Sequence, residues 1–197
     1  MKKQVWTVWV ILALLLPVVS YATTPMDAIR TDINKVLDVL SDKSLKGESG
    51  KEVKKTKIMK IADEMFDFSE LSRRTLALKW NKLNAAQQKE FVDLYTELLE
   101  DTYASKILSY TNEKVLYGKE ITLTEKTVEV QTTIVTKKAD VPINYRVIRK
   151  GNDWKVYDVV IEGVSLISNY RSQFNEILTN KSPEALLDTL RKKVGRK

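Results

Sequence analysis

The sequence predicts an α+β fold: N-terminal helices, a curved antiparallel sheet of about four strands, and C-terminal helices that enclose an apolar pocket. Apolar residues recur at helical spacing from Ile29 to Ile107, and they alternate with polar residues from about Ile121 to Glu162. Helical spacing returns after Gly163. Helices and strands segregated along a chain are typical of the α+β class. A curved sheet covered by helices forms a cone, although the pattern alone does not show that the cone is hollow.

The N-terminus has the features of a secretory signal. A basic head, Lys2 and Lys3, precedes an apolar run of about 15 positions, and Ser20-Tyr21-Ala22 supplies small residues at the spacing of a cleavage site. A membrane-spanning helix needs about 20 apolar residues. We therefore expect residues 1–22 to be a signal peptide and residues 23–197 to form a single domain with a helical subdomain; the alternative is an uncleaved anchor.

Two helices are expected next. Thr24-Pro25-Met26-Asp27 is typical of a helix start, with a capping threonine, a proline at the first position and an acid in the first turn. Apolar spacing continues this helix to Leu40. The polar stretch 41–50 contains two glycines and predicts a loop, and a basic helix is expected from Lys51 to Met65.

Two further helices begin with capping sequences. Asp67-Phe68-Ser69-Glu70 predicts a helix through about Lys79, and Asn84 with Gln87 opens a longer one. The apolar stripe of the longer helix is rich in aromatic residues and reaches Ile107. Such a stripe is compatible with ordinary core packing and with the wall of a cavity.

The central region predicts the sheet. Ile121 and Leu123 lie on the first expected strand, and strict alternation marks the next two, 128–134 and 141–147. A turn at Gly151-Asn152-Asp153 leads into the last strand, Trp154 to Glu162. Apolar residues are nearly continuous in that strand, which predicts burial on both faces or a β-bulge.

The C-terminal region predicts two helices. Apolar residues from Val164 to Leu178 fit helical spacing. Ser182-Pro183 opens a final helix that carries Leu186, Leu187, Leu190 and Val194.

The composition favours binding over catalysis. The chain has no cysteine and no histidine, which excludes Ser-His-Asp and Cys-His machinery and a sulfur-based zinc site. Its six glycines form neither a phosphate-binding loop nor a dinucleotide-binding motif. We expect no catalytic residue, no metal and no cofactor.

The formal charge of +7 suits an anionic membrane surface or an acidic partner, but it is equally typical of a solvated surface. Nucleic acid is not an expected partner for an exported protein.

Long ordered motifs resemble the MlaC family, also called toluene-tolerance or organic-solvent-resistance proteins. The run from Phe66 to Leu76 is similar to the family, as are Trp80, Gln87-Gln88, Phe91 and Leu98-Leu99-Glu100. The later motifs are Ile143 to Arg146, Gly151, Trp154 to Val159, Ile161 to Leu166 and Asn169 to Phe174. The resemblance extends from about Ile29 to Leu190.

The resemblance implies a periplasmic carrier with an NTF2-like sheet and an added helical subdomain. Such a carrier holds a phospholipid as its ligand, with the acyl tails in an apolar pocket and the headgroup toward solvent. It exchanges that lipid with an inner-membrane ABC transporter complex and with an outer-membrane lipoprotein–porin complex of the Mla type, which maintains outer-membrane lipid asymmetry. We expect a monomer.

We expect the pocket between the concave face of the sheet and the long helix. The candidate lipid-binding residues on the strands are Val130, Thr132, Ile143, Tyr145, Val147, Tyr157, Val159 and Ile161. Those on the helices are Trp80, Phe91, Leu98, Tyr103, Val164, Tyr170 and Phe174. For each residue the alternative is a place in the ordinary core, and Trp80 fits a structural role better than a lipid contact. Arg73, Arg74 and Arg171 are weaker candidates for the phosphate, since local ion pairs are commoner.

Two other classes of function stay open. NTF2-like cones also house isomerases and dehydratases, in which Asp158, Glu162 or Tyr157 would act as an acid or base in an apolar pocket. The last class is a periplasmic protein–protein adaptor with a solid core, which would carry no extractable ligand.

Overall fold

The computed structural model describes residues 23–110 and 113–196, and the predicted signal peptide at residues 1–22 lies outside them. The helices before the sheet are α1 (Pro25–Ser41), α2 (Gly47–Met65), α3 (Phe68–Leu76), the 3₁₀ helix η1 (Ala77–Lys82) and α4 (Ala85–Leu108). The strands are β1 (Lys114–Thr124), β2 (Thr127–Val135), β3 (Asp140–Lys150), β4 (Asp153–Ile161) and β5 (Val164–Ser165). Two helices follow, α5 (Leu166–Asn180) and α6 (Pro183–Lys193).

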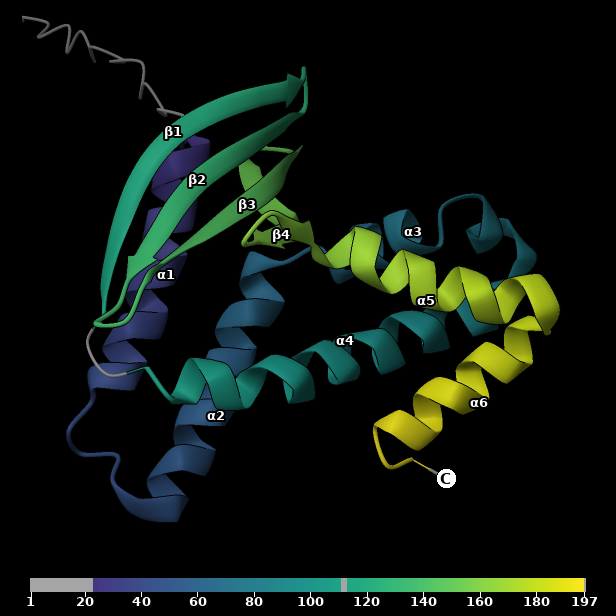
Figure 1. The fold of residues 1–197 in the computed structure, drawn as a ribbon, viewed down its shortest axis with the longest axis horizontal. Coiled ribbons are helices and arrows are strands. Elements are labelled where there is room, and N and C mark those ends of the chain that lie inside the picture. Colours follow the sequence, from purple (N-terminus) through teal and green to yellow (C-terminus); the bar gives the residue numbers. More distant parts are fainter. Residues whose placement is uncertain (1–22, 111–112, 197) are drawn as a thin grey trace, which may run out of the picture.

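The strands form one antiparallel sheet in the order β1-β2-β3-β4-β5. The sheet curves strongly, and α1 crosses one of its faces (Figure 1). The predicted α+β fold, with helices on either side of an antiparallel meander, is therefore confirmed. The fifth strand has only two residues. A strand of that length has no alternation, so the pattern predicted about four strands.

The loop predicted at residues 41–50 is wrong in its second half, because α2 already begins at Gly47. Only residues 42–46 connect the two helices. The two glycines suggested a loop, but Gly50 lies inside the helix, where the backbone of Leu45 approaches it closely. A β-carbon added at Gly50 would lie 2.5 Å from the carbonyl carbon of Leu45. This glycine therefore permits a close approach of two backbones.

The helix that opens at Asp67 is shorter than predicted. The Asp67 side chain accepts a hydrogen bond from the backbone N–H of Glu70 at 2.9 Å, as expected of a cap. The helix ends at Leu76 and not near Lys79, because Ala77 has a positive φ of 49°. A 3₁₀ helix follows directly.

Strand β4 is buried on both faces and also contains a bulge, so both explanations of its continuous apolar run are confirmed. Arg146 pairs with Asp158, but the next residue of β3, Val147, pairs with Val156. Tyr157 is the extra residue between them. Val156 packs under the sheet, whereas Tyr157 packs among the helices.

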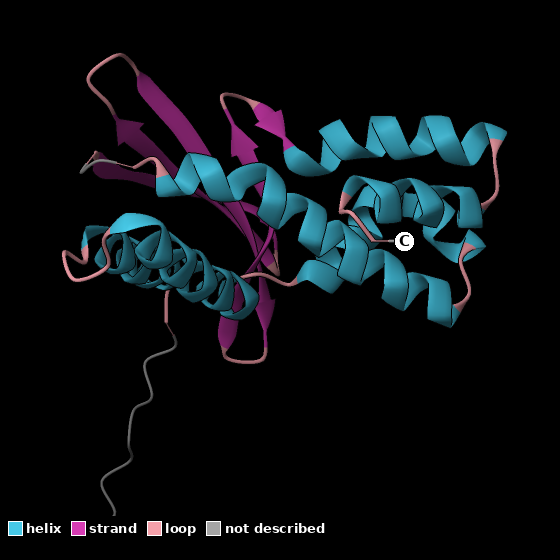
Figure 2. Ribbon diagram, turned by 90° about the horizontal axis from the view of Figure 1, so that it is seen from below, coloured by secondary structure: helices cyan, strands magenta, loops and turns pink. Residues whose placement is uncertain are grey.

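Two hydrophobic clusters form the interior. One lies among α3, α4, α5 and α6, and the other lies between the sheet and α1 (Figure 2). Phe66 and Tyr103 pack against both clusters. Among the residues described, no helix is long and apolar enough to cross a membrane.

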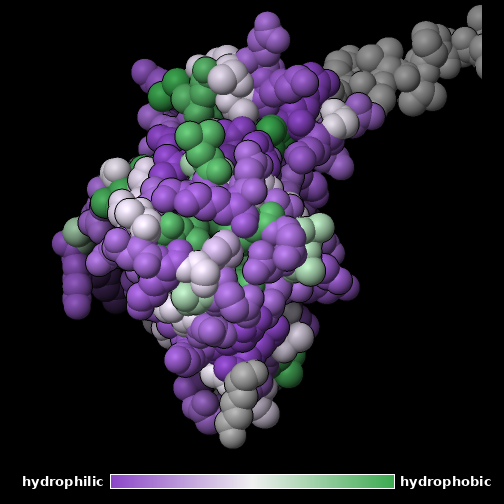
Figure 3. All heavy atoms as spheres, turned by 90° about the vertical axis from the view of Figure 1, so that its right-hand side faces the viewer, coloured by the Kyte–Doolittle hydropathy of each residue, from purple (hydrophilic) through white to green (hydrophobic). Residues whose placement is uncertain are grey.

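The end of the molecule that carries η1 and the α5–α6 connection is largely hydrophilic, with apolar side chains scattered over it (Figure 3). Leu78 of η1 is 88% exposed. Single exposed apolar residues are common on protein surfaces and do not mark a site. The candidate site lies at the other end, where the sheet meets the first two helices.

Candidate functional site: an apolar cavity beneath the sheet

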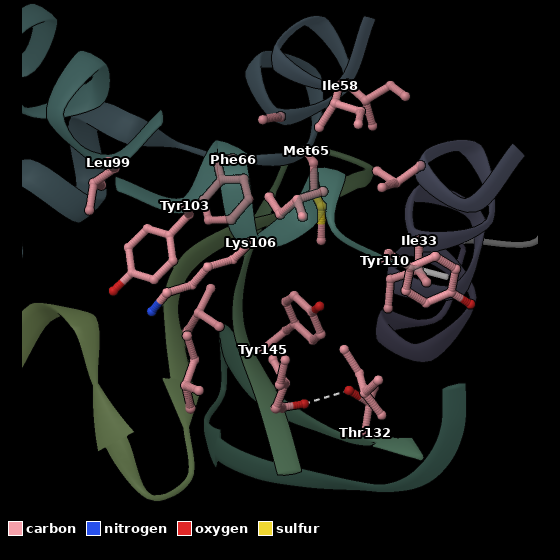
Figure 4. A pocket seen from close by; sticks show the side chains of 18 of the residues that line it. Ile33, Ile58, Met65, Phe66, Leu99, Tyr103, Lys106, Tyr110, Thr132 and Tyr145 are labelled. Carbon is pink, nitrogen blue, oxygen red and sulfur yellow. Dashed lines mark hydrogen bonds between the residues drawn. The ribbon is translucent and has the colours of Figure 1, made fainter. Parts of the chain in front are cut away.

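A cavity of about 490 Å³ lies between the sheet and the helices α1, α2 and α4 (Figure 4). The strand residues that line it are Val115, Thr132, Ile134, Val141, Ile143, Tyr145, Val159 and Ile161. Helices α1 and α2 contribute Ile33, Val36, Leu37, Leu40, Ile58, Met59, Ile61, Ala62 and Met65. Helix α4 contributes Leu99, Glu100, Tyr103, Lys106 and Ile107, and Phe66, Phe68, Tyr110, Glu162 and Leu166 complete the wall. This volume is within the range of small-molecule binding sites.

Local sequence explains why each element turns an apolar face to the cavity. On β2 and β3 the alternation places Thr132 opposite Ile143 and Val130 opposite Tyr145, all on one face of the sheet. Ile33, Leu37 and Leu40 recur at helical spacing on α1. The apolar faces of the sheet, of α1 and of α2 converge, so their side chains line one cavity.

The polar groups in the wall are few, and several are satisfied or kept neutral. The hydroxyl of Thr132 donates a hydrogen bond to the backbone oxygen of Ile143, which leaves its methyl group available for apolar contacts. Burial raises the pKa of Tyr145 to about 12, so its phenol is uncharged at neutral pH. Burial also raises the pKa of Glu100, and the carboxylates of Asp63 and Asp101 reinforce that shift. This environment favours apolar ligand atoms.

Six of the residues predicted to bind lipid line the cavity: Tyr103, Thr132, Ile143, Tyr145, Val159 and Ile161. Val130 and Val147 lie on the same face of the sheet but are fully buried in the cluster beside the cavity. Val130 lies directly opposite the cavity-lining Tyr145, and Val147 lies two residues further along β3, opposite Val128.

The other predicted residues lie elsewhere. Phe91, Tyr157, Tyr170 and Phe174 belong to the helical cluster, against which Trp80 and Leu98 also pack. The rings of Phe91 and Phe174 meet edge to face with centroids 5.5 Å apart. Val164 on β5 is 58% exposed. The structure therefore divides the predicted set into a cavity group, a pair buried beneath the sheet, a helical core group and one exposed residue.

The three arginines suggested for a phosphate are engaged outside the cavity wall. Arg73 and Arg74 both bind the carboxylate of Glu70, at 2.8 Å and 2.7 Å. The Arg74 guanidinium also lies 4.1 Å from the ring centroid of Tyr157. Arg171 donates to the backbone oxygens of Arg74, at 2.7 Å, and Thr75.

Asp158, the candidate acid or base, is 1% exposed and lies outside the cavity wall. Its carboxylate accepts hydrogen bonds from Ser165 Oγ at 2.6 Å, from the backbone N–H of Ile167 at 3.1 Å and from Arg146 at 3.1 Å. These contacts tie the bulged strand to the start of α5. Among the other candidates, Tyr157 packs in the helical cluster and Glu162 lies exposed on the cavity wall.

Sequence reasoning missed the contribution of α1 and α2, and it missed Lys106. The apolar stripe of α1 was visible, but helical spacing does not show whether a face meets other side chains or a cavity. Within residues 23–110 and 113–196, no group of three or more Asp or Glu residues is arranged to hold a metal ion.

The fold and the cavity together define an α+β protein with an apolar cavity beneath a curved antiparallel sheet. A family model described as "MlaC protein" matches residues 30–192. The chain belongs to the MlaC family.

Individual relatives agree with this assignment. The intermembrane phospholipid transport system binding protein MlaC of Haemophilus influenzae is 29% identical over 119 residues, which is 58% of this chain and 56% of that relative. The match thus spans little more than half of that relative's length. Toluene tolerance protein ttg2D of Pseudomonas putida is 21% identical over 159 residues, 80% of this chain and 74% of the relative.

A solved structure has the same fold. The phospholipid-binding protein of Ralstonia solanacearum, determined in complex with a phospholipid, superposes with a TM-score of 0.76 at 24% identity. The superposition covers 86% of this chain and 96% of that protein.

Proposed function

We propose that this protein is a phospholipid carrier that holds the acyl tails of its ligand in the cavity beneath the sheet. The observation that carries the proposal is the cavity itself, whose wall is apolar over nearly all of its extent. Support comes from the relatives, one named for intermembrane phospholipid transport and another for phospholipid binding. The lining residues Thr132, Ile143, Tyr145, Val159 and Ile161 form the floor against which the tails pack.

The energetics of acyl chains fit a carrier. Burying one methylene contributes about 0.8 kcal/mol, so two chains of roughly 15 methylenes each contribute on the order of 25 kcal/mol relative to water. A bound lipid therefore does not escape into water at a useful rate. A bilayer offers the tails a similar gain, so transfer between cavity and membrane is near balance. Docking against a membrane partner shortens the exposure of the tails.

The setting of this exchange is the periplasm, reached through the signal peptide at residues 1–22. The partners are an inner-membrane ABC transporter complex and an outer-membrane lipoprotein–porin complex of the Mla type, and the exchange maintains outer-membrane lipid asymmetry. The carrier acts as a monomer of one lipid-binding domain and needs no cofactor.

The protein is not an enzyme under this proposal. The three contacts of Asp158 engage its carboxylate in holding β4 to β3 and to the start of α5, and Asp158 does not line the cavity. An adaptor with a solid core is less compatible with a cavity of about 490 Å³.

Native mass spectrometry tests the proposal. The protein is purified from the periplasm without detergent, and we expect an adduct of one phospholipid mass that extraction then identifies. The variant Ile143→Trp should lose at least half of that adduct, because the larger ring fills the cavity that Ile143 lines. The matched control is Asn144→Trp, whose side chain points to the opposite face of the same strand.

The outcomes separate the classes of function. A protein that carries no lipid and takes up none from added liposomes is not a carrier. Equal loss of lipid in Ile143→Trp and Asn144→Trp would place the lipid somewhere other than the concave face of the sheet.

A further inference from the structure

The charged side chains in the cavity wall differ in sign and in surroundings. Three of the described lining residues carry a carboxyl group or an amine: Glu100, Lys106 and Glu162. Carboxylates repel a phosphate, so an anionic group that enters with the lipid is attracted by Lys106 alone among these three. Lys106 lies in the last turn of α4, where the helix dipole favours a cation.

Lys106 differs from the three arginines that the sequence suggested as phosphate ligands. Arg73, Arg74 and Arg171 each have a carboxylate or backbone partner that satisfies the guanidinium. Among the described residues, the Lys106 ammonium has no ion pair and no hydrogen-bond acceptor, and its one contact is with an aromatic ring. An exposed ammonium without a carboxylate or hydrogen-bond partner in the protein keeps its donors available to a ligand.

The Lys106 side chain extends toward the ring of Tyr103. The ammonium lies 5.5 Å from the ring centroid of Tyr103, which is itself part of the cavity wall. Figure 4 shows the lysine extended past the Tyr103 ring, with its nitrogen at the side of the cavity away from Ile33 and Tyr110. The stem of Lys106 covers apolar surface while its charged end stays in water.

We propose that Lys106 binds the phosphate of the lipid headgroup and so sets which end of the ligand faces solvent. The inference rests on the proposed function, because it needs a ligand whose tails occupy the cavity. The proposed contact is a charge-assisted hydrogen bond at the exposed rim of the cavity, while Ile143 and Tyr145 contact the tails inside the cavity. The lysine thereby distinguishes a phospholipid from a diacylglycerol, which has the same tails and no phosphate.

The test compares these two ligands. Purified, lipid-free protein is mixed with vesicles that contain radiolabelled phosphatidylglycerol or radiolabelled diacylglycerol, and the lipid bound per protein is counted after the vesicles are removed. For Lys106→Met we expect phosphatidylglycerol loading to fall about threefold to fivefold, as suits a single exposed charge pair. Diacylglycerol loading should not change, because diacylglycerol has no phosphate and methionine keeps an apolar stem at this position.

Two further variants complete the design. Lys106→Arg should restore phosphatidylglycerol loading, since a guanidinium also binds phosphate. Lys60→Met is the matched control, because Lys60 is an exposed lysine of α2 outside the cavity wall. It should load both lipids as the unaltered protein does. A drop in Lys60→Met equal to that in Lys106→Met would overturn the inference by showing a general charge effect on vesicle contact.

Other outcomes separate failure of the inference from failure of the proposed function. Unchanged phosphatidylglycerol loading in Lys106→Met, or an equal loss of both lipids, removes the phosphate contact but leaves a carrier. Inorganic phosphate that binds the lipid-free protein and shifts the NMR signal of the Lys106 amine would assign a free-anion site in place of a headgroup site. An unaltered protein that loads neither lipid would refute the carrier function, and the inference with it.

Discussion

Asp158 shows how a buried charge can serve the fold of this protein. The carboxylate is shared by Arg146 on β3, by Ser165, which caps α5, and by the first turn of that helix. All of its contacts come from elements that must meet at the bulge of β4. A buried carboxylate with this many donors is costly to change.

Asp158→Asn should destabilise the protein without emptying the cavity. The amide can still accept one hydrogen bond, but Arg146 loses an ionic partner, so we expect a loss of about 1–3 kcal/mol in the free energy of unfolding. Denaturant unfolding measures that loss, and native mass spectrometry measures lipid occupancy. The control is Glu129→Gln, which removes the other carboxylate that pairs with Arg146. The Glu129 side chain is 13% exposed, so we expect a smaller loss in the free energy of unfolding. Full stability together with loss of a catalytic turnover in Asp158→Asn would favour the enzyme class.

Single positions also show which part of the site the sequence could predict. Alternation on β3 places Ile143 and Tyr145 on one face, and both line the cavity. The same alternation includes Val147, which is fully buried beside it. A period of two residues identifies a face but does not say where along that face packing gives way to space. Whether the lining residues touch a lipid stays a prediction.

At the scale of an element, the apolar spacing of helix α4 likewise identifies a face without showing what that face contacts. Its first half carries Phe91 and Tyr95 into the helical cluster, and its second half carries Leu99 and Tyr103 to the cavity. One continuous apolar stripe thus serves two environments. Helical spacing predicted the stripe, but the partners of each half depend on contacts from α5 and from the sheet, which are distant in sequence.

In helix α2, the close approach of the Leu45 backbone to Gly50 leads to a prediction about stability. Gly50→Ala should destabilise the protein, although alanine is the better helix former by about 1 kcal/mol. The new β-carbon would lie 2.5 Å from a backbone atom of Leu45, and backbone cannot move away as a flexible side chain can. We expect a fall of about 4 °C or more in Tm, from roughly 1–3 kcal/mol of strain. Glu52→Ala, an exposed position of the same helix, is the control and should change Tm little. An increase in Tm for Gly50→Ala would show that the loop before α2 relaxes freely.

At the scale of the whole molecule, two packed regions share a boundary at Phe66 and Tyr103. The helical region is filled by aromatic rings in contact, such as Tyr95 and Phe174 with centroids 5.2 Å apart. The region beneath the sheet contains the cavity. The order of helices, strands and helices was predictable because each element carries its own period. Which region would be filled and which would contain a cavity was not predictable, because it depends on where the curved sheet leaves space between its face and the helices α1, α2 and α4.

Because the region beneath the sheet contains a cavity, a ligand that fills it should change the stability of the protein. A ligand that binds only the folded state stabilises it by RT ln(1 + [L]/Kd), about 2.7 kcal/mol at a hundredfold excess over Kd. Extraction of the lipid should therefore lower Tm by roughly 5–10 °C for a chain of this size. Scanning calorimetry of loaded and extracted protein measures the difference.

The control is Ile143→Trp, in which protein atoms replace ligand atoms in the cavity. Its Tm should change by less than half as much on extraction, because little lipid is bound to begin with. Reloading the extracted, unaltered protein from vesicles should restore its Tm, which excludes damage during extraction. An identical Tm for loaded and extracted protein would mean that the ligand does not occupy the cavity beneath the sheet, since filling that space must stabilise the elements that surround it.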